Sequence, residues 1–143
     1  LGGVEPGAYG QIQMLPAGSL MLSGKLSVML AAGFEPALGD QWEIISQQAD
    51  KLPAKIGGQF DEIQLPEPPK GRRYVLHQDD SGMRLVSTCL GDTNGDGLLD
   101  FFDVSLFVTQ FSMSDPLSDI NKDGSINFFD VSLFITAYLG GCS

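Results

Sequence analysis

Basic residues are scarce in this chain. Of 143 residues only eight are Lys or Arg, against 18 Asp or Glu, which gives a formal net charge of -10 and a pI near 4.2. Nucleic-acid binding needs clustered Lys and Arg to meet the phosphates, so this composition excludes a nucleic-acid partner. The same shortage argues against binding to an anionic membrane surface.

Long hydrophobic runs are absent as well. Gly, Ser or Asp interrupts every apolar stretch before the roughly 20 residues that a membrane-spanning helix needs, so we expect no membrane insertion. Hydrophobic residues still make up 43% of the chain, enough for a packed core. Residue 1 is leucine and no signal-peptide pattern precedes it, so we expect either a processed terminus or a piece of a longer chain.

Catalytic signatures are missing too. The single histidine, His77, has no GxSxG or HExxH motif beside it, and we expect it on a strand face. Adjacent acidic residues such as Asp61 and Glu62 would point to opposite faces of a strand, a poor start for paired-carboxylate catalysis. The sequence therefore predicts a protein that is not an enzyme.

Residues 1–90 contain short runs of alternating apolar residues separated by turn signals such as Pro16-Ala-Gly18 and Gly57-Gly58. Such runs with frequent turns predict an antiparallel β-sandwich or jelly roll. We expect strands at Tyr9–Met14, Ser19–Leu22, Lys25–Ala31, Gln41–Gln47, Gln59–Leu65, Arg73–Gln78 and Met83–Thr88.

The acidic charge is concentrated in residues 91–143, which hold eight aspartates, no glutamate and one base, Lys122. The reason is an internal repeat: the segment 92–111 recurs at 119–138, with 12 identities in 20 aligned pairs. Repetition this dense indicates a duplicated structural unit. Short carboxylates in tight, glycine-containing loops are typical of calcium sites.

Each copy fits a twelve-residue calcium loop in which positions one, three, five, seven, nine and twelve supply oxygen ligands and a glycine at position six allows a sharp turn. Gly97 and Gly124 occupy position six. The sequence therefore predicts two Ca²⁺ sites. The predicted ligands are Asp92, Asn94, Asp96, the Leu98 carbonyl, Asp100 and Asp103 in the first loop, and Asp119, Asn121, Asp123, the Ser125 carbonyl, Asn127 and Asp130 in the second.

Each loop is followed by a helical pattern, Phe101–Phe111 and Phe128–Leu139, with apolar residues at i, i+3, i+4 and i+7. No helix is expected before either loop, because residues 85–90 resemble a strand and residues 113–118 a turn-like linker. Each unit is therefore a loop with one exiting helix.

This arrangement, together with Asp rather than Glu at position twelve, resembles a type I-like dockerin domain. The resemblance implies a small all-α domain over residues 91–143 that binds two Ca²⁺ ions and docks onto a cohesin partner. It also implies that helix residues just after each loop contact the partner. Those positions are Phe101, Phe102, Val108 and Thr109 in the first copy and Phe128, Phe129, Ile135 and Thr136 in the second. Core packing of Phe102 and Phe129 is one alternative, and contact of the phenylalanines with residues 1–90 of the same chain is another.

The two cysteines, Cys89 and Cys142, bracket the repeat. An even number of cysteines in a chain of extracellular character favours a disulfide, and the close termini that the dockerin resemblance implies make this pairing plausible. Two free buried thiols are the alternative.

The pattern of Leu26, Val28 and Leu30, followed by Trp42 and Ile44, looks like a β-sandwich module of bacterial secreted proteins. We therefore expect a non-catalytic bacterial protein, extracellular or on the cell surface, with a sandwich at 1–90 and a docking domain at 91–143. One alternative is a structural subunit in which copies of the chain pack into a surface layer or filament stapled by calcium. A weaker alternative is a carbohydrate-binding module in which Trp42 and Tyr74 stack on a glycan.

Overall fold

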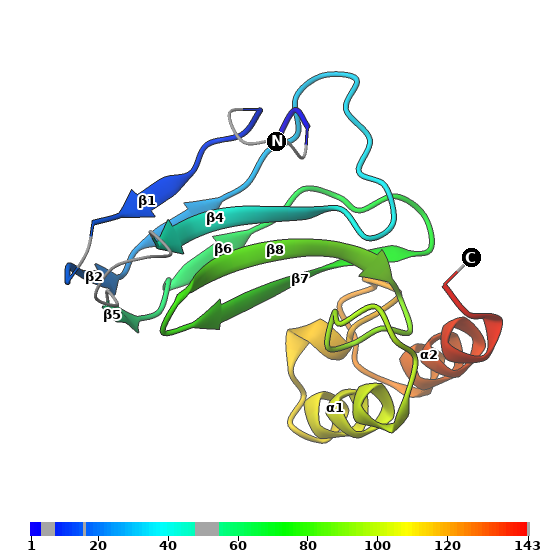
Figure 1. Cartoon of the computed structure of the whole chain (residues 1–143). Coiled ribbons are helices and arrows are strands. Elements are labelled where there is room, and N and C mark those ends of the chain that lie inside the picture. Colours follow the sequence, from blue (N-terminus) through cyan, green and yellow to red (C-terminus); the bar gives the residue numbers. More distant parts are fainter. Residues whose placement is uncertain (4–7, 16, 48–54, 143) are drawn as a thin grey trace.

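Eight strands and two α-helices make up the regular structure in the part of the chain that a computed structural model describes, residues 1–3, 8–15, 17–47 and 55–142 (Figure 1). The strands are β1 (Ile12–Met14), β2 (Ser19–Leu22), β3 (Lys25–Ser27), β4 (Gln41–Gln47), β5 (Lys55–Gly58), β6 (Glu62–Gln64), β7 (Arg72–Asp79) and β8 (Gly82–Cys89). The helices are α1 (Phe101–Ser112) and α2 (Phe128–Gly140), with a short 3₁₀ helix η1 (Pro116–Ser118) between them.

The strands form one four-stranded sheet in the order β1-β4-β8-β7 and two two-stranded ribbons, β2-β5 and β3-β6. The contacts of β8 with β4 and with β7 are antiparallel. The pairs β1–β4, β2–β5 and β3–β6 are all parallel. The segment from β1 to β3 therefore runs alongside the segment from β4 to β6, which lies about 35 residues later in the chain.

The core lies against β4 and β8. Trp42 and Leu85 have no exposed surface, and they pack with Val28 and Tyr74. A second cluster joins Ile45 and Met83 to residues of β1, β2 and β5. The indole N–H of Trp42 donates to the Gly3 carbonyl at 2.8 Å, so this buried polar group is satisfied. Because Trp42 is fully buried, the glycan-stacking surface considered for it does not exist.

The expected fold class, a β-sandwich or jelly roll followed by a small all-α dockerin-like domain, is wrong. The chain forms a small mixed α/β domain. Three parallel strand pairs take the place of the expected antiparallel ones, because alternation of side chains predicts strands but not their partners. The boundary at residue 90 stays a prediction.

Strand positions agree with the expected ones in part. The strand β5 lies at Gly57 and Gly58, where the sequence suggested a turn, and β1, β3 and β6 are shorter than expected. Both expected helices are confirmed within one residue at each end. Among the described residues, no helix is long and apolar enough to span a membrane.

The helices α1 and α2 pack on each other through Phe107 and Phe134. Their rings stack with centroids 4.1 Å apart and an angle of 7° between planes. These two phenylalanines are 2% and 3% exposed. One aromatic ring from each repeat thus forms the centre of the helical part.

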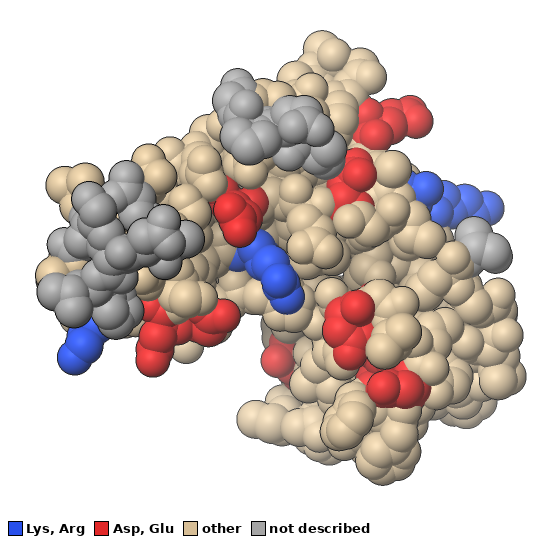
Figure 2. Space-filling view, viewed as in Figure 1, with Lys and Arg blue, Asp and Glu red and all other residues tan. Residues whose placement is uncertain are grey.

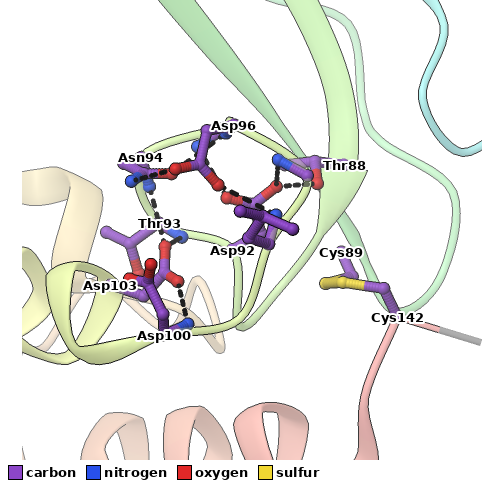
Figure 3. Close-up of a disulfide and its surroundings, with 12 residues drawn as sticks. Thr88, Cys89, Asp92, Thr93, Asn94, Asp96, Asp100, Asp103 and Cys142 are labelled. Carbon is purple, nitrogen blue, oxygen red and sulfur yellow. Dashed lines mark hydrogen bonds between the residues drawn. A yellow bond between two sulfur atoms is a disulfide. The ribbon is translucent and has the colours of Figure 1, made fainter.

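The predicted disulfide between Cys89 and Cys142 is confirmed, with the two Cα atoms 5.2 Å apart. It joins the end of β8 to the residues just after α2 (Figure 3). The bond closes a segment with a sequence separation of 53 and ties the chain just after α2 to the end of β8, one of the two inner strands of the sheet.

We expect reduction of this disulfide to lower the free energy of unfolding by about 4 kcal/mol, the chain-entropy value for a loop of this length. Guanidinium unfolding of the oxidised and the fully reduced, thiol-alkylated protein measures the difference. An unchanged unfolding midpoint after complete alkylation would contradict the expectation.

Candidate functional site

The first loop is organised around Asp92, which is fully buried. Its carboxylate accepts hydrogen bonds from the N–H of Gly95 at 2.7 Å and of Gly97 at 2.9 Å, and from the hydroxyl of Thr88 on β8 (Figure 3). Gly97 has φ of +86°, the left-handed conformation expected at loop position six. The loop therefore turns back over the carboxylate at its first position and is anchored to the sheet.

Asn94 and Asp96 hold the outer part of the same loop. The N–H of Asp96 donates to the side-chain carbonyl of Asn94 at 3.0 Å, and the N–H of Leu98 donates to the Asp96 carboxylate at 2.8 Å. The Asn94 amide also donates to Asp96 at 3.0 Å. These side chains fold back on their own backbone as Asx turns do.

Asp103, at loop position twelve, is buried and fixes the loop to the start of α1. Its carboxylate accepts from the N–H groups of Thr93 at 2.7 Å, Asn94 at 3.2 Å and Asp100 at 3.0 Å. The Asp100 side chain in turn accepts from the N–H of Phe102 at 2.8 Å, and it forms a capping box with Asp103, in which each side chain accepts from the backbone N–H of the other residue. One carboxylate thus holds both ends of the loop.

The second loop repeats this arrangement with Asp130, which accepts from the N–H groups of Ile120, Asn121 and Asn127 at 2.9, 3.2 and 2.9 Å. Burial by itself would raise the pKa of Asp130, but these backbone hydrogen bonds lower it, and the pKa lies below its ordinary value. Asp130 is therefore held in its charged form.

Asp119 distinguishes the second loop from the first. Its Oδ2 accepts from the N–H of Gly124 at 2.9 Å, while its Oδ1 is buried without a hydrogen-bond partner. The position of Gly95 is taken by Lys122 in this loop, and the Lys122 ammonium pairs with Glu67 at 2.9 Å. A buried carboxylate oxygen that lacks a partner is costly unless a ligand meets it.

The fit of calcium to these loops rests on two observations. Every side chain at a predicted ligand position offers an oxygen atom, the kind of ligand that Ca²⁺ prefers. In addition, the buried Asp119 Oδ1 has no hydrogen-bond partner. Within the described ranges, however, no three His, Cys, Asp or Glu side chains converge in an arrangement that could hold a metal ion. Calcium binding at both loops therefore stays a prediction.

The predicted partner-binding residues lie on the surface of both helices. At the helix starts, Phe101 and Phe102 are 75% and 68% exposed, and their repeat counterparts Phe128 and Phe129 are 74% and 69% exposed. Core packing of Phe102 and Phe129, one alternative expectation, is therefore wrong. The remaining four predicted contact residues are exposed as well: Val108, Thr109, Ile135 and Thr136.

A junction between the first loop and β7 was not expected. A Cβ atom at Gly95 would lie 2.8 Å from Val75 Cβ and 2.9 Å from His77 Nε2, so the loop backbone rests on this strand. The Arg73 guanidinium lies at the same junction. Burial lowers the pKa of Arg73, while the charges of Asp92 and Asp103 raise it.

From the sequence alone, Arg72 and Arg73 beside Lys70 indicate a solvated rim or, as the alternative, a basic patch that answers the acidic repeat. The spacing of Arg73, Val75 and His77 at every second position was the available signal, because it places the three side chains on one face of a strand. For Arg73 the structure favours the alternative, because the charges of Asp92 and Asp103 in the first loop act on it.

Comparison of the chain with protein-family models, with curated protein sequences and with solved structures gave no match. The function must therefore be inferred from the residues and the geometry described above.

Two glycines with positive φ test the junction. We expect Gly95→Ala to lower the free energy of unfolding by about 1–3 kcal/mol more than Gly97→Ala, because only the new methyl group at residue 95 would collide with Val75 and His77. Both variants share the strain of an alanine at positive φ. Equal unfolding midpoints for the two variants in urea would show that the loop does not rest on β7.

Proposed function

We propose that this chain is a non-catalytic, extracellular calcium-binding protein that docks onto another protein through the starts of α1 and α2. The observation that carries the proposal is the duplicated pair of exposed phenylalanines, Phe101 and Phe102 in one repeat and Phe128 and Phe129 in the other. Large exposed apolar side chains gathered on one element are typical of interaction surfaces.

Calcium would be held by the twelve ligands predicted for the two loops, and its charge would offset that of the clustered aspartates. Residues 91–143 carry eight aspartates and one lysine, a formal charge of -7. Asp103 and Asp130 connect each loop to the helix that follows it. A calcium ion that orders a loop would therefore also fix the start of the following helix, and with it the phenylalanine pair in the first helical turn.

An extracellular location is supported by the disulfide, because such bonds persist mainly in oxidising compartments. Within this location we propose a bacterial secreted or cell-surface protein, as the resemblance to dockerins implies. The partner would be a cohesin-like domain, which is the partner class of the dockerin family.

The repeat offers two equivalent docking surfaces. Besides the phenylalanine pairs, Val108 corresponds to Ile135, and both are half-exposed or more, at 56% and 50%. The hydroxyls of Thr109 and Thr136 donate to the carbonyls of Ser105 and Ser132, each at 2.8 Å. A partner could therefore engage either helix with the same set of contacts.

Calcium affinity should differ between the loops. The first loop has four carboxylates at ligand positions and the second has three, because Asn127 replaces Asp100, so we expect the first loop to bind more tightly. Calcium titration followed by the amide NMR signals of Gly97 and Gly124 reports each loop separately. Asp100→Asn should remove the difference, and filling of the second loop first in the unmodified protein would contradict the expectation.

Docking is tested with an immobilised type I cohesin domain, in calcium and then in chelator. We expect Phe101→Ser/Phe102→Ser to retain affinity within about twofold, because the second surface remains. Substituting all four phenylalanines by Ser should weaken binding by about thirtyfold or more, the effect of losing aromatic anchor residues. Met29→Ser, which removes an equally exposed side chain elsewhere, is the control. Equal binding of the four-residue variant and the control would refute this surface.

The second candidate is a structural subunit that assembles with copies of itself. It is favoured by the same exposed phenylalanines, which could pack from chain to chain. Gel filtration coupled to light scattering, with calcium and then with chelator, separates the two functions. A particle well above 15.3 kDa that dissociates in chelator supports the structural subunit, and a monomer in both conditions supports docking onto a separate partner.

A further inference from the structure

A groove runs along the free edge of β7. It has a volume of about 690 Å³, and six consecutive residues of the strand, 73–78, line it. Neighbouring strand residues point to opposite faces, so a groove lined by all six follows the strand's edge. Of the described strands only β8 pairs with β7. Figure 2 shows that the surface is hollowed between the part of the molecule formed by the strands and the part formed by α1 and α2. The opposite walls are apolar and come from Phe60, Ile63 and Leu65, and from Leu106 and Leu117.

Several residues that line this groove have a buried polar atom without a partner. Among the described residues, seven buried side-chain N or O atoms lack a hydrogen-bond partner, and five of them belong to groove residues. The five atoms are Arg73 Nη1, Tyr74 OH, His77 Nε2, Thr93 Oγ1 and Gln110 Oε1. Apolar walls with a few unpaired polar groups are typical of ligand sites, and each unpaired group lowers stability until a partner meets it.

The charge of the groove is opposite to that of the chain. Although the protein has 18 acidic and eight basic residues, no Asp or Glu lines the groove, and its charged side chain is Arg73. The other titratable groups that line it are Tyr74 and His77. The charges of Asp92 and Asp103 in the first loop also act on Arg73 and raise its pKa, against the larger effect of burial, which lowers it. Because Arg73 is the charged side chain that lines the groove, an acidic side chain is the charged group best matched to the Arg73 end of the groove.

We propose that the groove binds an extended peptide that adds a strand to the edge of β7 and places an acidic side chain at Arg73. Every second residue of β7 turns its N–H and C=O away from β8, and these groups would pair with the peptide backbone. Six residues of strand span about 20 Å, so the peptide would contribute about six residues. The apolar side chains next to the acidic one would point to the other face of the peptide, toward the wall that contains Ile63.

This proposal does not depend on docking through the helices. The groove residues lie on β6, β7, α1 and the loops, and none of the predicted partner-binding residues lines it. Asn94 is shared with the first calcium-type loop, so calcium and peptide binding could influence each other through that side chain.

The test uses the peptide acetyl-KVTVEVTVK-amide, with the full protein labelled with nitrogen-15. We expect saturable binding, shifts of β7 amide signals, and slower hydrogen exchange at the outward-facing β7 amides. Two matched peptides, one with Gln in place of Glu and one N-methylated at alternate residues, should each bind at least about tenfold more weakly, because one loses the charge-assisted hydrogen bond and the other the backbone donors.

Protein variants locate the site. Ile63→Glu adds a charge of the same sign as the peptide's Glu to a wall residue that is 49% exposed, and we expect it to weaken binding of the Glu-containing peptide at least about tenfold. Met29→Glu adds the same charge to an exposed residue outside the groove and should leave affinity unchanged. Arg73→Gln should abolish the preference for Glu over Gln if the variant folds, which circular dichroism checks.

Four results would overturn the proposal. The first is equal affinity for all three peptides, and the second is a shift pattern confined to α1 and α2. The third is broadening of β7 signals with protein concentration alone, which would assign the edge to a second copy of this chain. Saturation of the groove by propionate at the same concentration as the peptide would also refute a peptide-specific site.

Discussion

Two buried carboxylates, Asp103 and Asp130, set the geometry of the helical part. Each accepts three backbone hydrogen bonds, two from the start of its loop and one from the residue that caps its helix. A carboxylate buried without such donors would be strongly destabilising. The loop conformation and the helix start are therefore not independent: neither forms fully without the other.

A buried carboxylate and a close backbone contact also connect the first loop to the sheet. Asp92 accepts from Thr88 of β8, and the backbone at Gly95 rests on Val75 and His77 of β7. The first loop is thus held between two strands and a helix, whereas Lys122 of the second loop forms an exposed ion pair with Glu67, which lies in the connection between β6 and β7. Exposed ion pairs contribute little stability. The two repeats, nearly identical in sequence, therefore differ in how firmly they are anchored.

Much of the site could be predicted from the sequence, and the fold in part. The helices, the loop glycines at Gly97 and Gly124, and the Cys89–Cys142 pair depend on local spacing or on cysteine number, so the sequence records them directly. Strand pairing depends on contacts between distant residues, which periodicity does not record. The parallel partners of β1, β2 and β3 were missed for this reason, and so was β5, whose Gly57 and Gly58 also suit turns. The groove at Arg73 could not be predicted for the same reason, because its walls come from β6, β7 and α1, which lie apart in the sequence.

The disulfide has a mechanical consequence. A pull on the chain beyond Cys142 would not reach the helices or loops, because the covalent bond passes the tension directly to Cys89 at the end of β8. That strand lies inside the four-stranded sheet, hydrogen-bonded on both sides. The repeats between the two cysteines would remain slack under load. A surface presented by α1 and α2 would then keep its shape while the rest of the chain carries the force.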